Sequence, residues 1–133
     1  MIARQIEKIK SLKKQQTEIN RQLKEESSPK LTAKSTIPRM SEWLLHECRE
    51  DNEKTKIRIV LFVICAMFAP VTLASEPLPR GLRSCLSKTF KIKGGMVSYY
   101  LNGLYLYYER YKSFRNEVDR LLEIVNASVL PNI

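Results

Sequence analysis

The chain is poor in the residues from which catalytic and metal sites are built. It contains a single histidine, His46, with only 4 glycines and 3 cysteines in 133 residues. It has no glycine-rich phosphate loop, no H-E-x-x-H pair and no nucleophile elbow. His46 and Cys48 are two candidate ligands, whereas a zinc site needs three or four. We therefore expect no catalytic activity, no bound metal and no cofactor.

The cysteines do not suggest a disulfide framework either. The chain has an odd number of cysteines, which are widely spaced and form no C-x-x-C pair: Cys48, Cys65 and Cys85. We predict thiols that act as small, buried apolar side chains in a reducing cytoplasm.

The chain also lacks a run long enough to cross a membrane. Its most apolar stretch, residues 59–74, has 16 residues and is interrupted by Pro70, whereas a spanning helix needs about 20. Basic residues precede it, as in a signal peptide, but it begins far from the N-terminus. We predict that residues 54–69 form a central helix that is buried on all sides. A membrane anchor at residues 59–74 is the less favoured alternative.

Positive charge, in contrast, is abundant. Lysine and arginine number 23 against 14 acidic residues, which gives a net charge of +9. Such an excess attracts polyanions, meaning nucleic acid or an anionic membrane surface. Between residues 78 and 95 there are five basic residues and no acidic one: Arg80, Arg83, Lys88, Lys91 and Lys93. The simplest interpretation is a solvated face, but such groups also supply phosphate contacts.

Residues 1–26 are predicted to form an N-terminal helix because residues 2–25 carry a heptad pattern. The first seam position recurs every seven residues and is taken by Ile2, Ile9, Gln16 and Leu23. The second lies three residues after the first and is taken by Gln5, Leu12 and Ile19. A lone helix this polar is marginal in water, so it needs a packing partner. Either it lies against its own domain or it forms a coiled coil with a second copy, and we favour the homodimer. Residues 27–38, with two prolines and no apolar period, are predicted to be a linker.

Residues 39–133 are predicted to form a helical domain. The expected fold class is all-α, a small helical bundle with a helix-turn-helix-like unit and an extended N-terminal helix. A first helix should start at Ser41 and place Trp43, Leu44 and Cys48 on one side. A final helix should begin near residue 104, with an apolar stripe formed by Leu104, Tyr108, Tyr111, Val118, Leu121, Leu122 and Val125.

The segment 79–103 has the spacing of a helix-turn-helix. With Val97 as the buried residue of the second helix, the other apolar positions follow: Leu86 and Phe90 in the first helix, Ile92 after the turn and Tyr100 one turn beyond Val97. Ser87 falls where a helix-turn-helix places a small residue, because the two backbones approach each other there. The stretch MVSYYLNG resembles the second helix of many bacterial repressors. Residues 83–103 thus resemble the bacterial helix-turn-helix DNA-binding superfamily.

Two features depart from that family. Lys91 stands at the turn position usually taken by glycine, and it must adopt a left-handed conformation there at some cost. Gly94 and Gly95 begin the second helix and weaken it by about 1 kcal/mol each. They could also let the backbone approach a phosphate, since helix N-termini bind anions. The alternative interpretation is an ordinary loop between two core helices.

The resemblance implies a small protein that binds double-stranded DNA, either a transcription regulator or an accessory factor of a mobile element. The side chains expected to face the major groove are Lys93, Ser98, Tyr99 and Asn102, with Arg80, Arg83, Lys88 and Lys91 on the flanking phosphates. The main alternative is a non-catalytic helical interaction module in a larger assembly. Six tyrosines between residues 99 and 111 could also stack on single strands, but core packing explains most of them. Tyr99 and Tyr107 are expected to be the exposed ones.

Overall fold

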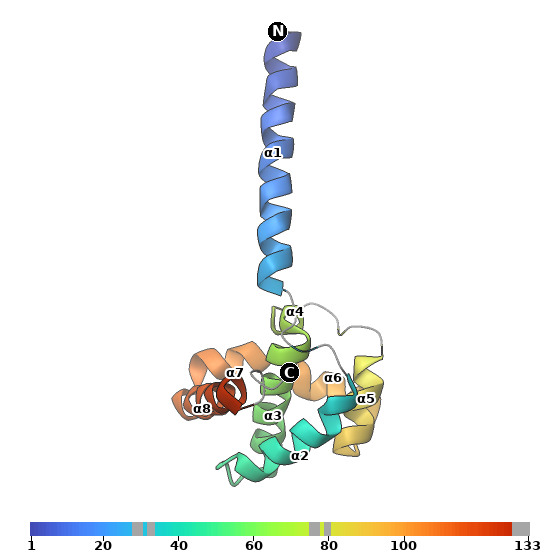
Figure 1. Ribbon diagram of the computed structural model, residues 1–133, viewed down its shortest axis with the longest axis vertical. Helices are drawn as coiled ribbons and strands as arrows, with labels where there is room; N and C mark the ends of the chain where they lie inside the picture. The colour runs from blue at the N-terminus through green and yellow to red at the C-terminus, as the bar shows by residue number, and fades with distance from the viewer. Residues whose placement is uncertain (28–30, 32–33, 75–77, 79–80, 129–133) are drawn as a thin grey trace.

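The protein consists of one long helix that stands out from a cluster of shorter helices (Figure 1). The computed structural model describes residues 1–27, 31, 34–74, 78 and 81–128. The long helix, α1, spans Ile2–Ser27. The cluster contains η1 (Lys34–Thr36), α2 (Ile37–Glu47), α3 (Glu53–Phe68), α4 (Pro70–Leu73), α5 (Leu82–Phe90), α6 (Gly94–Leu101), α7 (Leu104–Arg110) and α8 (Lys112–Ser128). The part of the chain described here has no strand, so the predicted all-α class is confirmed.

Helix α3 lies at the centre of the cluster and is the predicted central helix. Its N-terminus is capped by Asn52, whose side-chain oxygen accepts a hydrogen bond from the Thr55 N–H at 3.1 Å. Residues 59–65 are all buried, and α2, α4, α6 and α8 pack around this helix. None of the helices in the described ranges combines the length and apolarity that a bilayer crossing requires.

Helix α2 begins at Ile37, four residues before the predicted start at Ser41. Pro38 occupies its first turn, where a missing N–H is tolerated. Ser41 is therefore a buried residue inside the helix, and its hydroxyl has no hydrogen-bond partner among the described residues. The predicted apolar side of this helix is confirmed, because Leu44 and Cys48 are buried and Trp43 packs against the core.

Much of the predicted linker, residues 27–38, lies outside the described residues. Within it, Leu31 is buried, and its N–H donates a hydrogen bond to the Met67 carbonyl at 3.0 Å. Ile37 and Pro38 belong to α2. The segment between the long helix and the cluster is thus attached to the last turn of α3 at Leu31.

The prediction of one continuous final helix is wrong. Tyr111 has an extended backbone, with φ −109° and ψ 107°, and it separates α7 from α8. The two helices pack on each other, and the Tyr108 hydroxyl donates a hydrogen bond to Asp119 at 2.7 Å. The Arg115 guanidinium donates to carbonyls in the last turn of α7 at 2.9 and 3.0 Å. Because the chain bends here, Tyr111 is exposed and Phe114 takes the buried position instead.

Candidate nucleic-acid interface

Helices α5 and α6 are joined by a three-residue turn, residues 91–93, at the place where the sequence predicted the turn of a helix-turn-helix. Lys91 adopts the left-handed conformation, with φ 56° and ψ 43°, as its place in the pattern predicted. The Ile92 N–H donates to the Ser87 carbonyl at 3.1 Å, which is the six-to-one hydrogen bond of a Schellman motif. The Ser87 hydroxyl donates to the Ile92 carbonyl. Lys93 then has an extended backbone and leads into α6.

The packing between these helices also follows the predicted pattern. Leu86 and Val97 are fully buried, and Tyr100 is nearly so. Phe90 and Ile92 are half-buried and pack against the same core. The apolar positions that define the unit therefore belong to one core, in which α6 packs on both α5 and α3.

Neither glycine at the start of α6 is required by the packing of the domain. A Cβ at Gly94 would meet only the Arg83 side chain at an ordinary 3.7 Å, and a Cβ at Gly95 would meet nothing within 4 Å. Neither residue has a positive φ. The described fold therefore leaves room for alanine at both positions, and the first turn of α6 presents bare backbone at Gly95.

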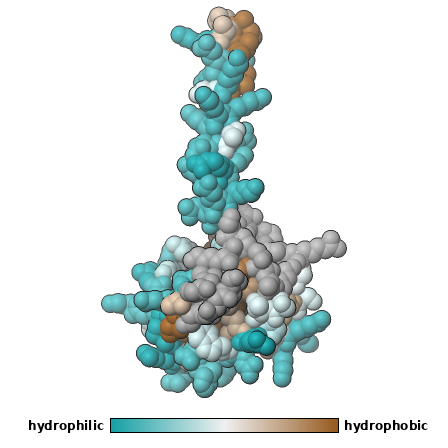
Figure 2. Space-filling model, in the orientation of Figure 1, coloured by the Kyte–Doolittle hydropathy of each residue, from teal (hydrophilic) through white to brown (hydrophobic). Residues whose placement is uncertain are grey.

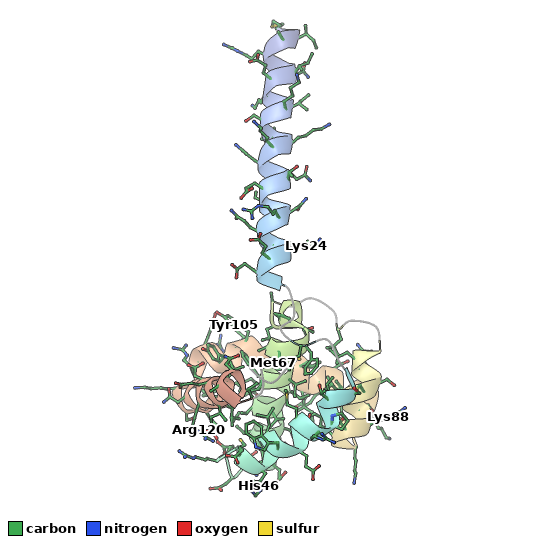
Figure 3. The ribbon with its side chains drawn as sticks, viewed as in Figure 1. Lys24, His46, Met67, Lys88, Tyr105 and Arg120 are labelled. Atoms are coloured by element: carbon green, nitrogen blue, oxygen red, sulfur yellow. The ribbon has the colours of Figure 1, made fainter. Side chains whose placement is uncertain are left out.

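The basic residues predicted to contact phosphates are exposed wherever the structure describes them. Arg83, Lys88, Lys91 and Lys93 are all exposed, and Lys88 projects away from the domain on α5 (Figure 3). Arg80 lies outside the described residues. The salt bridges found in the described part of the chain involve Arg21 and Arg120, not these cations. Their charges are thus available to an anionic partner.

Three of the predicted base-contacting residues gather at one hollow, and the fourth does not. Ser98, Tyr99 and Asn102 line a cavity of about 910 Å³, together with Arg83 and Gly95. Residues of α4 and α7 form other parts of its wall. Lys93 does not line it, and neither do Lys88 and Lys91. The side of α6 that carries these residues therefore borders the hollow, with Ser98 half-buried and Tyr99 and Asn102 exposed.

Arg58 is a charged residue at this surface that the sequence did not point to. Its guanidinium carbon lies 4.9, 5.2 and 5.8 Å from the ring centroids of Tyr107, Tyr100 and Tyr99. Cation–π attraction of this kind holds α3, α6 and α7 together. Its Nε is buried and has no hydrogen-bond partner among the described residues. No sequence signal distinguished Arg58 from the other basic residues before the apolar run, because its ring partners lie more than 40 residues away.

The tyrosine-rich stretch packs differently from the prediction in two positions. Tyr99 is exposed as expected, but Tyr107 is half-buried between Tyr111 and Phe114, with ring centroids 5.5 and 5.7 Å away. Tyr111 is 56 % exposed instead of lying in the core stripe. Tyr107 and Tyr111 thus exchange the predicted exposed and buried positions. This follows from the bend at Tyr111, which turns the two rings relative to the core.

Two of the three thiols are buried as the sequence predicted, whereas Cys85 is only half-buried. Cys48 and Cys65 are buried and free. Burial raises the pKa of the Cys65 thiol to about 12, and burial is also the main cause that raises the pKa of Cys48. Such groups are poor nucleophiles at neutral pH. Within the described ranges, no group of three or more potential ligands could hold a metal ion.

Comparison with known proteins adds no relative to this description: no family model, curated protein or solved structure matches the chain.

Proposed function

We propose that the protein is a small, non-catalytic, cytoplasmic protein that binds double-stranded DNA through α5 and α6. It would act as a transcription regulator or as an accessory factor of a mobile element. The observation that carries the proposal is the turn itself. A lysine adopts the left-handed conformation at the position where the helix-turn-helix pattern requires it, and Leu86 and Val97 are buried on either side.

The exposed cations around the turn are assigned to the DNA backbone. Arg83, Lys88 and Lys91 would contact phosphates, with Arg80 extending the set, and each contact adds about 0.9 to the slope of log affinity against log salt. Gly95 would let the backbone of α6 approach a phosphate, because none of the described residues fills the space where its Cβ would lie.

Base recognition is assigned to the residues at the outer side of α6. Asn102 is exposed at the end of the helix and could bond an adenine through two hydrogen bonds. Lys93 and Ser98 would contact other base edges. Tyr99 would contact a base and would also keep its cation–π contact with Arg58, whose guanidinium carbon lies 5.8 Å from the centre of the Tyr99 ring.

The long helix α1 is assigned to homodimer formation. Its heptad seam is exposed, so the packing partner predicted from the sequence does not come from the described domain. A dimer would present two copies of α6 to one DNA molecule and would raise the affinity through the second contact.

One observation favours a second candidate function, a helical interaction module in a larger assembly. Large apolar and aromatic side chains are exposed across α6, α7 and the bend after α7: Met96, Tyr99, Tyr105, Leu106 and Tyr111. Tyrosine, methionine and arginine are enriched at protein interfaces. A protein partner seated on these residues would cover the same side of α6 that we assign to DNA.

A DNA titration at several salt concentrations tests the first candidate against the second. A preferred duplex is first selected from random sequences with the wild-type protein. Lys88→Ala should weaken binding to every duplex and lower the salt slope by about one unit. Asn102→Ala should cost about 1–3 kcal/mol on the selected duplex and little on random DNA. Lys112→Ala, an exposed lysine at the start of α8, is the matched control and should change neither quantity.

The opposite result would remove the DNA-binding proposal. If wild-type, Lys88→Ala and Asn102→Ala proteins bind duplex DNA equally weakly at physiological salt, then α5 and α6 are only core helices. The interaction-module candidate would then be the better account of the exposed residues on α6 and α7.

A further inference from the structure

One face of α1 is apolar over most of its length, and the described residues leave it uncovered. Its large apolar side chains are 46–67 % exposed: Ile2, Ile6, Ile9, Leu12, Ile19 and Leu23. Figure 2 shows apolar atoms along one side of this helix towards its free end. The opposite face carries a charged network in which Arg21 pairs with Glu18 and Glu25 at 2.5 and 2.6 Å. A helix divided in this way is stabilised when its apolar face is covered.

We propose that a second copy of α1 covers this face and runs in the opposite direction. The inference rests on the homodimer of the proposed function and adds its orientation and register. In this register Ile2 faces Ile19 of the second copy, Ile9 faces Leu12, and Gln5 faces Gln16. Every apolar seam residue within the overlap then meets an apolar one, and the two glutamines meet each other. A buried polar pair of this kind fixes the register of a coiled coil.

The charges beside the seam decide between the two directions. In a parallel, in-register pair, Lys8 of each chain faces Lys13 of the other, so like charges repel on both sides of the seam. In the antiparallel pair Lys8 lies beside Gln15, and Lys13 lies beside Ile6. The methylenes of Lys13 can then cover Ile6 while its ammonium group stays in water.

This arrangement separates the two domains. The overlap of residues 2–19 is about 27 Å long, and the two Ser27 residues lie roughly 50 Å apart along the axis, at a rise of about 1.5 Å per residue. Leu23 lies beyond the overlap, towards the domain. A parallel pair would instead place both domains at the same end. In the antiparallel dimer the two α6 helices therefore approach DNA from opposite ends of the paired α1 helices.

Distance measurement between two spin labels tests the direction. Glu26→Cys, placed in a full-length Cys85→Ser background, carries the label outside the overlap. In the antiparallel dimer the two labels should be roughly 45 Å apart, at about 1.5 Å of rise per residue. In a parallel dimer they should lie within about 20 Å, because neighbouring helix axes are about 8–10 Å apart. Dilution with unlabelled protein should remove the signal, which shows that the distance is between chains.

The alternative outcomes can be told apart. A dimer with only the short distance overturns the antiparallel arrangement and leaves the homodimer intact. A chain that sediments as a monomer overturns both, whereas the DNA titration judges DNA binding separately. Lys13→Glu should introduce the short distance, because it turns the repulsive Lys8–Lys13 contact of the parallel pair into an attractive one. A distance distribution unchanged by Lys13→Glu would overturn the electrostatic basis of the proposal.

Discussion

Helices α1 and α3 contain similar kinds of apolar residues but meet very different surroundings. In α3 the apolar residues surround the helix, and α2, α4, α6 and α8 cover it, so that residues 59–65 are all buried. In α1 they form one stripe, and Ile2 and Ile19 remain more than 60 % exposed. The comparison shows that one helix finds its packing partners inside the chain, whereas the described residues supply none for the apolar stripe of the other, for which we propose a second copy. The stability of α1 should therefore depend on protein concentration, and that of α3 should not.

The largest loss of stability should come from a substitution inside α3. Phe62 is buried, stacks on Tyr108 with ring centroids 5.1 Å apart and meets Phe114 edge-on at 6.2 Å. Phe62→Ala should lower the free energy of unfolding by about 3–5 kcal/mol, because it leaves a cavity between α3, α7 and α8. Chemical denaturation followed by circular dichroism measures this loss. A loss below about 1 kcal/mol would mean that α3 is not the centre of the domain.

A change of similar kind in α1 should affect assembly and leave the domain folded. Ile9→Lys places a charge in the seam and removes an apolar contact worth about 1.5–3 kcal/mol per chain. Analytical ultracentrifugation should show a dimer for the wild-type protein and a monomer for the variant. The denaturation midpoint of the domain should stay the same in both. A wild-type protein that is monomeric at high concentration would contradict the assignment of α1.

A substitution at Gly95 should raise the stability of the domain and lower its affinity for DNA. Gly95→Ala replaces a poor helix former with a good one, and the new Cβ meets none of the described residues within 4 Å, so the domain should gain about 1 kcal/mol. DNA affinity should fall because the methyl group keeps the backbone of α6 from a phosphate. Thermal unfolding and the DNA titration measure the two effects on one sample. Equal or tighter DNA binding by this variant would show that no phosphate lies against Gly95.

The smallest effect should come from the contacts that join α8 to the end of α2. Glu117 accepts hydrogen bonds from the Arg120 guanidinium at 2.8 Å and from the Arg49 backbone N–H at 2.5 Å. The hydrogen bond from Arg120, followed by that from Arg49, holds the pKa of Glu117 below its ordinary value. Because the folded pKa is lowered, this stabilisation is present above the unfolded pKa and is lost as the pH falls through the folded one.

The contribution of Glu117 should be about 1 kcal/mol or less, as for other ion pairs near a protein surface. Glu117→Gln should therefore lower the stability slightly at neutral pH and flatten its decline in acid. Denaturation midpoints measured from pH 7 to pH 3 test this. If the stability of the variant declines in acid as steeply as that of the wild-type protein, then other carboxylates cause the loss of stability in acid.

Local patterns predicted the turn between α5 and α6 better than they predicted the surface around it. Leu86, Lys91 and Val97 lie within one short segment, and their roles follow from spacing alone. Arg58 could not be placed in the same way, since the tyrosines that surround it come from α6 and α7. The hollow beside Ser98 and Asn102 was also unpredictable, because its walls include residues of α4 and α7.

The sequence by itself determined the all-α class, the buried central helix, the heptad stripe of α1 and the left-handed turn at Lys91. These features depend on periodicity and on backbone preferences over a few residues, which a linear pattern contains. Only the tertiary structure decided that α2 begins at Ile37, that the predicted last helix is interrupted at Tyr111 and that the described residues of the domain do not cover the apolar face of α1. Each of these depends on contacts between segments that lie far apart in the sequence, or on the lack of such contacts among the described residues, and a linear pattern contains neither.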